Sequence, residues 1–116
     1  MRYVLMFGGT MDEQREYDSR DKAEQGAVRA AVNQWFEEHG KAGRIVGGEE
    51  LRGPDMSTTV RRKNGQMTVV DGPFIESKEV VGGFAVIEVK DLDEALALAK
   101  SWPGGNMVEV RPVVEH

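Results

Sequence analysis

Two segments of this 116-residue chain are apolar on both faces of a strand, and they limit the folds that the chain can adopt. Residues 3–7 and 84–89 have the continuous apolar pattern of central strands that are covered on both sides. Only two stretches, from about Asp21 to His39 and after Asp91, repeat apolar residues at the three- and four-residue spacing of a helix. Two helices cover one face of a small sheet, so the other face needs a further cover.

The remaining strands are predicted from alternation and turn residues, over 44–51, 58–63, 66–70 and 107–114. Asn64-Gly65 is the strongest short hairpin signal, and a two-residue turn there pairs Val60 with Val69. The register divides the hairpin into two faces. One face carries Val60, Arg62, Met67 and Val69, and the other carries Thr59, Arg61, Lys63 and Thr68.

Helix boundaries follow from caps and apolar stripes. Residues 8–22 are polar and charged, and they predict a surface loop that leads into the first helix. Asp91 and Glu94 predict a capping box at the start of the second helix. The predicted inward positions are Val28, Ala31, Val32, Trp35 and Phe36 in the first helix, and Leu92, Ala95, Leu96, Ala99 and Trp102 in the second.

The element order is β-α-β-(hairpin)-β-α-β within a single domain over residues 1–116. This order predicts an α+β fold of the ferredoxin-like βαββαβ type with an additional β-hairpin, in which two helices lie on one face of an antiparallel sheet. No segment remains to cover the second apolar face. We therefore expect a homodimer in which the two sheets pack against each other.

Charge and composition argue against several classes of function. Fifteen Lys and Arg against 20 Asp and Glu give a net charge of −5, which disfavours nucleic-acid binding because that depends on neutralising phosphates. The absence of cysteine fits a cytoplasmic protein without disulfides, and two histidines are too few for a His-based metal site. The apolar run at the N-terminus is too short for a signal peptide or a membrane span, and no glycine pattern matches a nucleotide-binding loop. We expect no cofactor, metal, membrane or nucleic-acid partner.

The block Asp71-Gly72-Pro73-Phe74, followed by Glu76 and Lys78, is the segment in which we expect chemistry. Its glycine and proline end a strand, because glycine tolerates positive φ and proline cannot donate to a ladder. Asp71 is either a general base or ligand-orienting group, or the cap of an Asx-type turn. Phe74 is either a pocket wall or a core residue. Glu76 and Lys78 are either an acid–base pair in a cleft or a solvated edge.

Two residues outside this block are further candidates. His39 follows Trp35 by four residues at a helix C-terminus, where it is either a structural cation stabilised by the helix dipole or an acid–base group. Arg111 stands beside Glu109 and either forms an ion pair with it or holds a ligand carboxylate. We expect a small pocket between sheet and helices, edged by residues 71–78.

The signature Asp71-Gly72-Pro73-Phe74 with Glu76 and Lys78, together with residues 82–84 (Gly-Gly-Phe), 91–95 (Asp-Leu-Asp-Glu-Ala) and 108–112 (Val-Glu-Val-Arg-Pro), resembles the YCII-related, DGPF-type proteins. The resemblance extends over nearly the whole chain and implies the dimeric α+β barrel fold of the ferredoxin-like type. The family's biochemical role is mostly unassigned. Some relatives are similar to enzymes that use a His–Asp pair, including one that eliminates chloride from a chlorinated hydroxyquinol.

The chain departs from that family pattern at one position. Relatives often have a histidine where this chain has Val32, and His39 lies seven residues, roughly two helical turns, further along. The family histidine is therefore not carried over to His39.

Two functions remain open. One is a cofactor-free lyase or isomerase on a small oxygenated or aromatic molecule, with Asp71 transferring the proton and Lys78 or Arg111 holding an anionic group. The other is a non-catalytic binding or accessory module that holds a small molecule in the same pocket. The retained acidic turn favours the enzyme, and the missing histidine favours the binding module.

Overall fold

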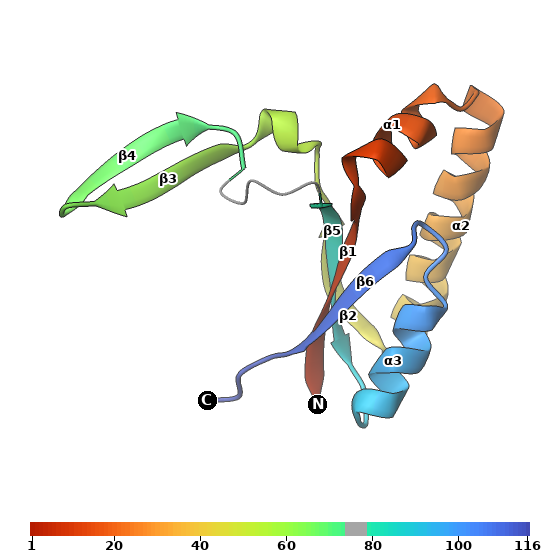
Figure 1. Cartoon of the computed structure of the whole chain (residues 1–116). Coiled ribbons are helices and arrows are strands. Elements are labelled where there is room, and N and C mark those ends of the chain that lie inside the picture. Colours follow the sequence, from red (N-terminus) through yellow and green to blue (C-terminus); the bar gives the residue numbers. More distant parts are fainter. Residues whose placement is uncertain (74–78) are drawn as a thin grey trace.

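The computed structural model describes residues 1–73 and 79–116 and is an α+β protein (Figure 1). All of its strand pairings are antiparallel. In chain order the elements are β1 (Arg2–Thr10), α1 (Met11–Ser19), α2 (Lys22–Lys41), β2 (Ile45–Glu50), a short 3-10 helix (Pro54–Met56), β3 (Thr58–Lys63), β4 (Gln66–Asp71), β5 (Glu79–Glu88), α3 (Leu92–Lys100) and β6 (Met107–Pro112).

The main sheet has the strand order β2-β5-β1-β6. The two segments that are apolar on both faces, β1 and β5, are its inner strands, as the sequence predicts. They pair with each other from Arg2↔Glu88 to Thr10↔Glu79. An inner strand has neighbours on both edges, so almost every peptide group in it is hydrogen-bonded without help from solvent.

The core lies between this sheet and the helices α2 and α3, which cover one face of it (Figure 1). The side chains of Leu5 and Ile87 have no exposed surface. The sheet contributes Tyr3, Leu5, Phe7, Ala85, Ile87 and Val89, and the helices contribute Trp35, Ala95 and Leu98. The other face of the two inner strands carries Val4, Met6, Phe84 and Val86, which are only partly buried. We call this second face the open face.

Aromatic rings fill one part of the layer between sheet and helices. Phe7 stacks on Trp102 with ring centroids 3.7 Å apart and planes 12° from parallel. Trp35 and Phe36 contact this pair edge-on. The indole N–H of Trp35 donates to Ser101 Oγ at 2.8 Å, so the polar end of the ring is satisfied although the ring is buried.

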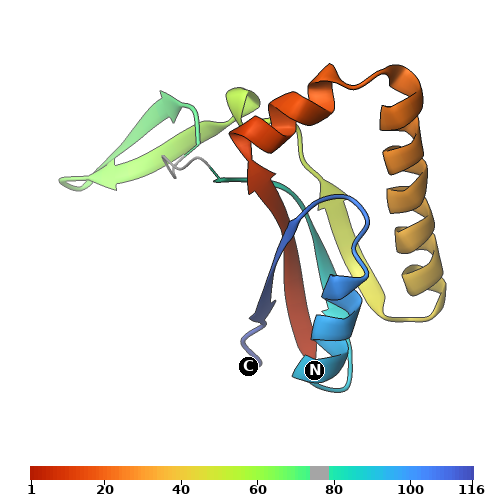
Figure 2. The same cartoon turned by 45° about the vertical axis from the view of Figure 1, so that its right-hand side comes forward.

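The hairpin β3–β4 forms a second, two-stranded sheet that projects away from the main body on the side opposite α2 and α3 (Figures 1 and 2). We call it the arm. Asn64 and Gly65 both have positive φ, +51° and +78°, as a type I′ turn requires. The predicted register, with Val60 opposite Val69, is confirmed. The radius of gyration is 16.1 Å, whereas a compact domain of this length has roughly 13 Å. The chain is therefore more extended than a compact domain, as its projecting arm requires.

Two predictions about the helices are wrong. The region expected to be a loop contains α1, because Thr10 caps it: the Thr10 side chain accepts from the Glu13 amide, and the Glu13 carboxylate accepts from the Thr10 amide. In α3, Leu92 and Leu96 are exposed, whereas Ala95 and Leu98 are buried. The prediction placed Leu92 and Leu96 in the core, whereas Leu98 is the leucine that is buried. The three leucines of α3 alternate with alanines, so apolar residues lie on two sides of the helix and the pattern does not show which side is buried.

The remaining helix predictions are confirmed in outline. Asp91 caps α3 by accepting from the Glu94 amide at 2.9 Å, which is one half of the predicted capping box, and Trp35 is the buried residue of α2. Within residues 1–73 and 79–116, no helix combines the length and the apolar character that crossing a bilayer demands.

Candidate functional site

The described part of the signature, Asp71 to Pro73, forms the base of the arm where β4 ends. Asp71 is the last residue of β4 and pairs with Thr58. Gly72 has a φ of +110°, a backbone conformation that residues other than glycine rarely adopt. Its amide donates to the carbonyl of Ser57 at 2.8 Å, and the Thr59 hydroxyl donates to its carbonyl at 2.5 Å. Both bonds hold the turn against the start of β3.

These bonds bear on the two roles that the sequence left open for Asp71. An Asx-type cap needs an amide from the following residues, but the Gly72 amide is directed to Ser57 and Pro73 has no N–H. Asp71 is exposed, and neither of the next two residues binds its carboxylate. This geometry favours a carboxylate that is available to a ligand over one that caps the turn at these positions.

Three of the predicted ligand-binding residues, Phe74, Glu76 and Lys78, lie outside the described residues. The chain is described again from Glu79, which is opposite Thr10 at the end of β1. The signature therefore rejoins the main sheet beside the point where α1 begins.

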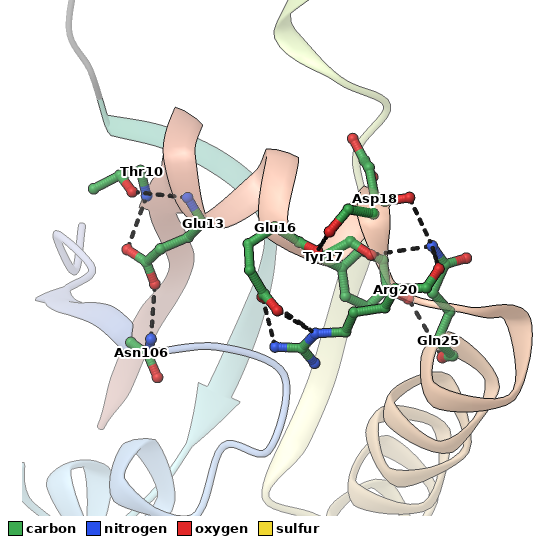
Figure 3. A network of polar contacts seen from close by, with 9 residues as sticks. Thr10, Glu13, Glu16, Tyr17, Asp18, Arg20, Gln25 and Asn106 are labelled. Atoms are coloured by element: carbon green, nitrogen blue, oxygen red, sulfur yellow. Dashed lines mark hydrogen bonds and ion pairs between the residues drawn. The ribbon is translucent and has the colours of Figure 1, made fainter.

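A polar cluster at this end of the sheet was missed by sequence reasoning. The Glu13 carboxylate accepts from the Thr10 amide at 3.1 Å and from the Asn106 side chain at 2.8 Å (Figure 3). The hydrogen bond from Asn106, followed by those from Thr10, lowers the pKa of Glu13 below its ordinary value. The Thr-x-x-Glu spacing predicts the contact with Thr10, but no local signal predicts Asn106, which is 93 residues from Glu13 in the chain.

The same close-up shows how α1 is tied to the start of α2 (Figure 3). Arg20 binds the Glu16 carboxylate through two nitrogens, at 2.9 and 2.7 Å. The side-chain amide of Gln25 donates to the carbonyls of Tyr17 and Arg20, at 3.1 and 3.2 Å. These contacts hold the turn between the two helices and involve none of the predicted site residues.

His39 lies in the last turn of α2, at the end of the sheet away from the arm (Figure 1). Its ring packs against Trp35 with centroids 5.2 Å apart, and its Nδ1 lies 3.2 Å from the Arg44 guanidinium. Because arginine only donates, Nδ1 is the acceptor in any hydrogen bond between them. Within one chain the structure does not bring His39 and Asp71 together, and it gives His39 structural contacts.

Arg111 lies on β6 and pairs with Val4, which places it on the open face. Its guanidinium binds the Glu109 carboxylate at 2.5 Å, the ion pair anticipated from their spacing. Both side chains are more than half exposed, so the pair contributes little to stability. Arg111 is thus held on the open face, with its guanidinium accessible.

The described residues contain no group of three or more His, Asp or Glu side chains arranged to hold a metal ion. A shallow hollow on the exposed side of α2 is lined by Gln34, Glu37, Glu38 and Lys41. Its Lys41 is bound to Glu37 at 2.9 Å, an exposed helical pair of ordinary type. We assign no role to this hollow.

A model of the YCII-related domain matches residues 1–116. The chain belongs to the YCII-related domain family. An uncharacterised protein of Rhizobium meliloti (strain 1021) is 36% identical to this YCII-related protein over 88 residues, which cover 72% of the chain and 68% of the relative. The resemblance recognised from the signature is confirmed.

In this YCII-related domain the three predicted site residues that the structure describes lie in three different places. Asp71 is at the base of the arm, Arg111 is on the open face, and His39 is at the far end of α2. A single chain thus offers an accessible carboxylate and an accessible guanidinium on the side of the sheet that α2 and α3 leave uncovered.

Proposed function

We propose that this YCII-related protein is a cytoplasmic homodimer that binds a small oxygenated or aromatic molecule at the base of the arm. The fold we propose for the dimer is the ferredoxin-like α+β barrel, in which two open faces pack together. The strand order β2-β5-β1-β6, with both inner strands apolar on the uncovered side, supports this packing.

The accessible carboxylate of Asp71 carries the binding proposal. The next amide along the chain, that of Gly72, donates to Ser57, and Pro73 supplies none, so the carboxylate can accept from a ligand hydroxyl or amine. In this proposal Phe74 is a wall of the site. Glu76 and Lys78 are its polar groups, and Lys78 holds an anionic ligand group. Arg111 pairs with Val4, six residues before Thr10 on β1, so it belongs to the site only as a residue of the second copy.

Binding without turnover is the function that we favour. The acid–base mechanism that the family resemblance implies pairs a histidine with an aspartate. This chain has Val32 at the position where relatives have that histidine, and His39 is held by Trp35 and Arg44 at the other end of the sheet. The protein is therefore proposed as a binding or accessory module.

A cofactor-free lyase or isomerase is the second candidate. The observation in its favour is again Asp71, because an exposed carboxylate next to a turn is suited to removing a proton from a bound hydroxyl or activated carbon. In this mechanism Asp71 accepts the proton, and Lys78, or Arg111 of the second copy, stabilises the anion that forms.

Calorimetry with a panel of di- and trihydroxybenzenes, with and without a ring carboxylate, tests the binding proposal. Asp71→Asn is expected to weaken binding at least about tenfold, which is the effect of removing a charge-assisted hydrogen bond. Asp55→Asn, another exposed aspartate near the base of the arm, is the matched control and should bind as the wild type does. Equal affinity of the two variants would remove Asp71 from the site.

The same panel separates the two candidate functions. Incubation of each binding compound with the protein, followed by proton NMR, detects any conversion. Binding with unchanged spectra supports the binding module, and conversion that Asp71→Asn abolishes supports the lyase or isomerase.

A further inference from the structure

The two faces of the arm differ in character. Val60, Met67 and Val69 share one face with Thr58, Arg62 and Asp71, and we call it the apolar arm face. The side chains of Val60, Met67 and Val69 are 54%, 54% and 66% exposed. On the opposite face Val70 is the only large apolar residue among Thr59, Arg61, Lys63, Gln66 and Thr68.

The arm lacks support from the described part of its own chain. β3 and β4 pair only with each other, and every residue in them except Thr59 is exposed. An isolated two-stranded hairpin is at best marginally stable in water and needs packing against another element. Three large apolar side chains in a row on an unsupported hairpin indicate a surface that is covered by a partner.

The arm and the open face lie on the same side of the molecule (Figures 1 and 2). The arm therefore projects on the side toward which the open face is turned. The arm is continuous with the open face through the 3-10 helix Pro54–Met56 that follows β2, so it extends the surface available to a partner beyond the four strands of the main sheet.

Charge favours a second copy of this chain as the partner. The arm, residues 58–71, contains three basic residues, Arg61, Arg62 and Lys63, and one acidic residue, Asp71, so it carries +2. The whole chain carries −5, which leaves −5 − 2 = −7 on the remainder. Glu49 pairs with Phe84 and so lies on the open face at its β2 edge. An arm of positive charge and a body of negative charge attract each other between two copies.

We propose that the arm is a dimerisation clasp: the apolar arm face of each copy packs on the body of the other copy. This proposal rests on the homodimer of the proposed function and deepens it. Asp71 belongs to the same face as Val69, so in the clasped dimer its carboxylate is turned toward the second chain. The ligand site at the base of the arm is then completed by residues of both copies. A two-fold axis lets both arms close at once.

Sedimentation analysis of the full chain and two lysine variants tests the clasp. Val69→Lys places an ammonium on the apolar arm face, and Val70→Lys places the same charge one residue away on the opposite face. Both valines are more than half exposed, at 66% and 56%, which makes the pair matched. Val69→Lys is expected to raise the dimer dissociation constant at least about tenfold, because an ammonium in an apolar contact is costly. Val70→Lys should leave it within about twofold of the wild type.

A fluorescent label supplies a second measurement that does not depend on destabilising the dimer. The chain has no cysteine, so Val69→Cys and Val70→Cys each carry a single environment-sensitive dye. Emission from the dye at position 69 is expected to shift to the blue as the protein concentration rises through the dissociation constant. Emission from position 70 should stay constant.

The outcomes separate the clasp from the proposals on which it rests. A dimer that both lysine variants form as tightly as the wild type, with no emission shift at position 69, overturns the clasp and leaves the sheet-to-sheet homodimer intact. A wild-type chain that stays monomeric at tens of micromolar overturns both the clasp and the homodimer. The binding test with Asp71→Asn is read independently of either result.

Discussion

The layered body and the arm are built from the same local signals but differ in what supports them. In the body, β1 has a neighbour on each edge and buries Tyr3, Leu5 and Phe7 against helices. In the arm, β3 and β4 have one neighbour each, and no residue of either strand is buried. Alternation and an Asn-Gly turn are sufficient to specify a hairpin. They are not sufficient to stabilise one, because stability comes mainly from buried apolar area.

The largest difference between the two regions should appear on truncation of an apolar side chain. Leu5→Ala removes a fully buried side chain and is expected to lower the free energy of unfolding by about 2–5 kcal/mol, from lost burial and the cavity left behind. Val70→Ala in the arm should change it by less than about 0.5 kcal/mol. Urea denaturation followed by circular dichroism measures both. Similar losses for the two variants would mean that the arm belongs to the cooperative core.

Glycine substitutions sharpen the comparison, because replacing glycine by alanine is expected to lower the stability of the arm and to raise that of the body. Gly65 has a φ of +78°, and Gly65→Ala is expected to destabilise the arm by about 1–2 kcal/mol through the strain of a left-handed alanine. Gly26 lies within α2 with nothing within 4 Å of an added Cβ, so Gly26→Ala should stabilise the body by about 0.5–1 kcal/mol.

Hydrogen exchange distinguishes local from global effects of these glycine variants. Gly65→Ala should accelerate exchange of amides in β3 and β4 at least about fivefold and leave the main sheet unchanged, since arm opening is local. Gly26→Ala should slow exchange throughout the main sheet. Accelerated exchange in β1 and β5 of the Gly65 variant would contradict the independence of the arm.

A helix cap offers a smaller test of the body. Asp91 accepts from the Glu94 amide at 2.9 Å and begins α3. Asp91→Ala is expected to lower the free energy of unfolding by about 1 kcal/mol, the usual effect of losing an N-cap. Asp93→Ala, an exposed acid in the first turn that does not cap, is the control and should have a smaller effect. Thermal denaturation measures the melting temperature of each variant. An equal decrease for both would mean that the Asp91 cap does not stabilise α3 more than an ordinary first-turn acid does.

The smallest expected effect is on acid stability. The pKa of Glu13 is lowered, chiefly by the hydrogen bond from Asn106, so its contribution to stability is present above its ordinary value of 4.5 and is lost as pH falls through the lowered value. Asn106→Ala should therefore flatten the fall in melting temperature below pH 4.5. Asn33→Ala, an exposed asparagine on α2, is the control. An unchanged pH profile for Asn106→Ala would contradict the assigned cause.

Much of the fold could be predicted from the chain alone. The inner strands, the hairpin register and the cap of α3 depend on contacts within one strand, one turn or one helical turn, where propensity and periodicity act directly. The same kind of signal precedes α1, because Thr10 and Glu13 have capping-box spacing, but the many charged residues around it favour the loop prediction. Leu92 and Leu96 were assigned to the core because a leucine-rich helix has two apolar faces and the sequence does not rank them.

The candidate site was less predictable for a different reason. The signature located Asp71 in a turn, and Pro73 has no N–H for the Asx turn that would use the amide two residues on. What the sequence did not show is that the Gly72 amide donates to Ser57, 15 residues earlier in the chain. His39 was a candidate base by residue type, and its contacts with Trp35 and Arg44 follow from how α2 meets β2. Such contacts depend on where whole elements come to lie.

The amino-acid sequence by itself determined the elements, the turn at Asn64-Gly65, the apolarity of both faces of β1 and β5, and the family signature. Only the tertiary structure decided that the arm projects on the uncovered side of the sheet and that Asp71 and Arg111 lie on that side while His39 lies at the far end of α2. The physical reason is the separation along the chain over which each kind of interaction acts. Backbone preferences act over a few residues, whereas the direction of an arm is set by packing between segments that are distant in the chain.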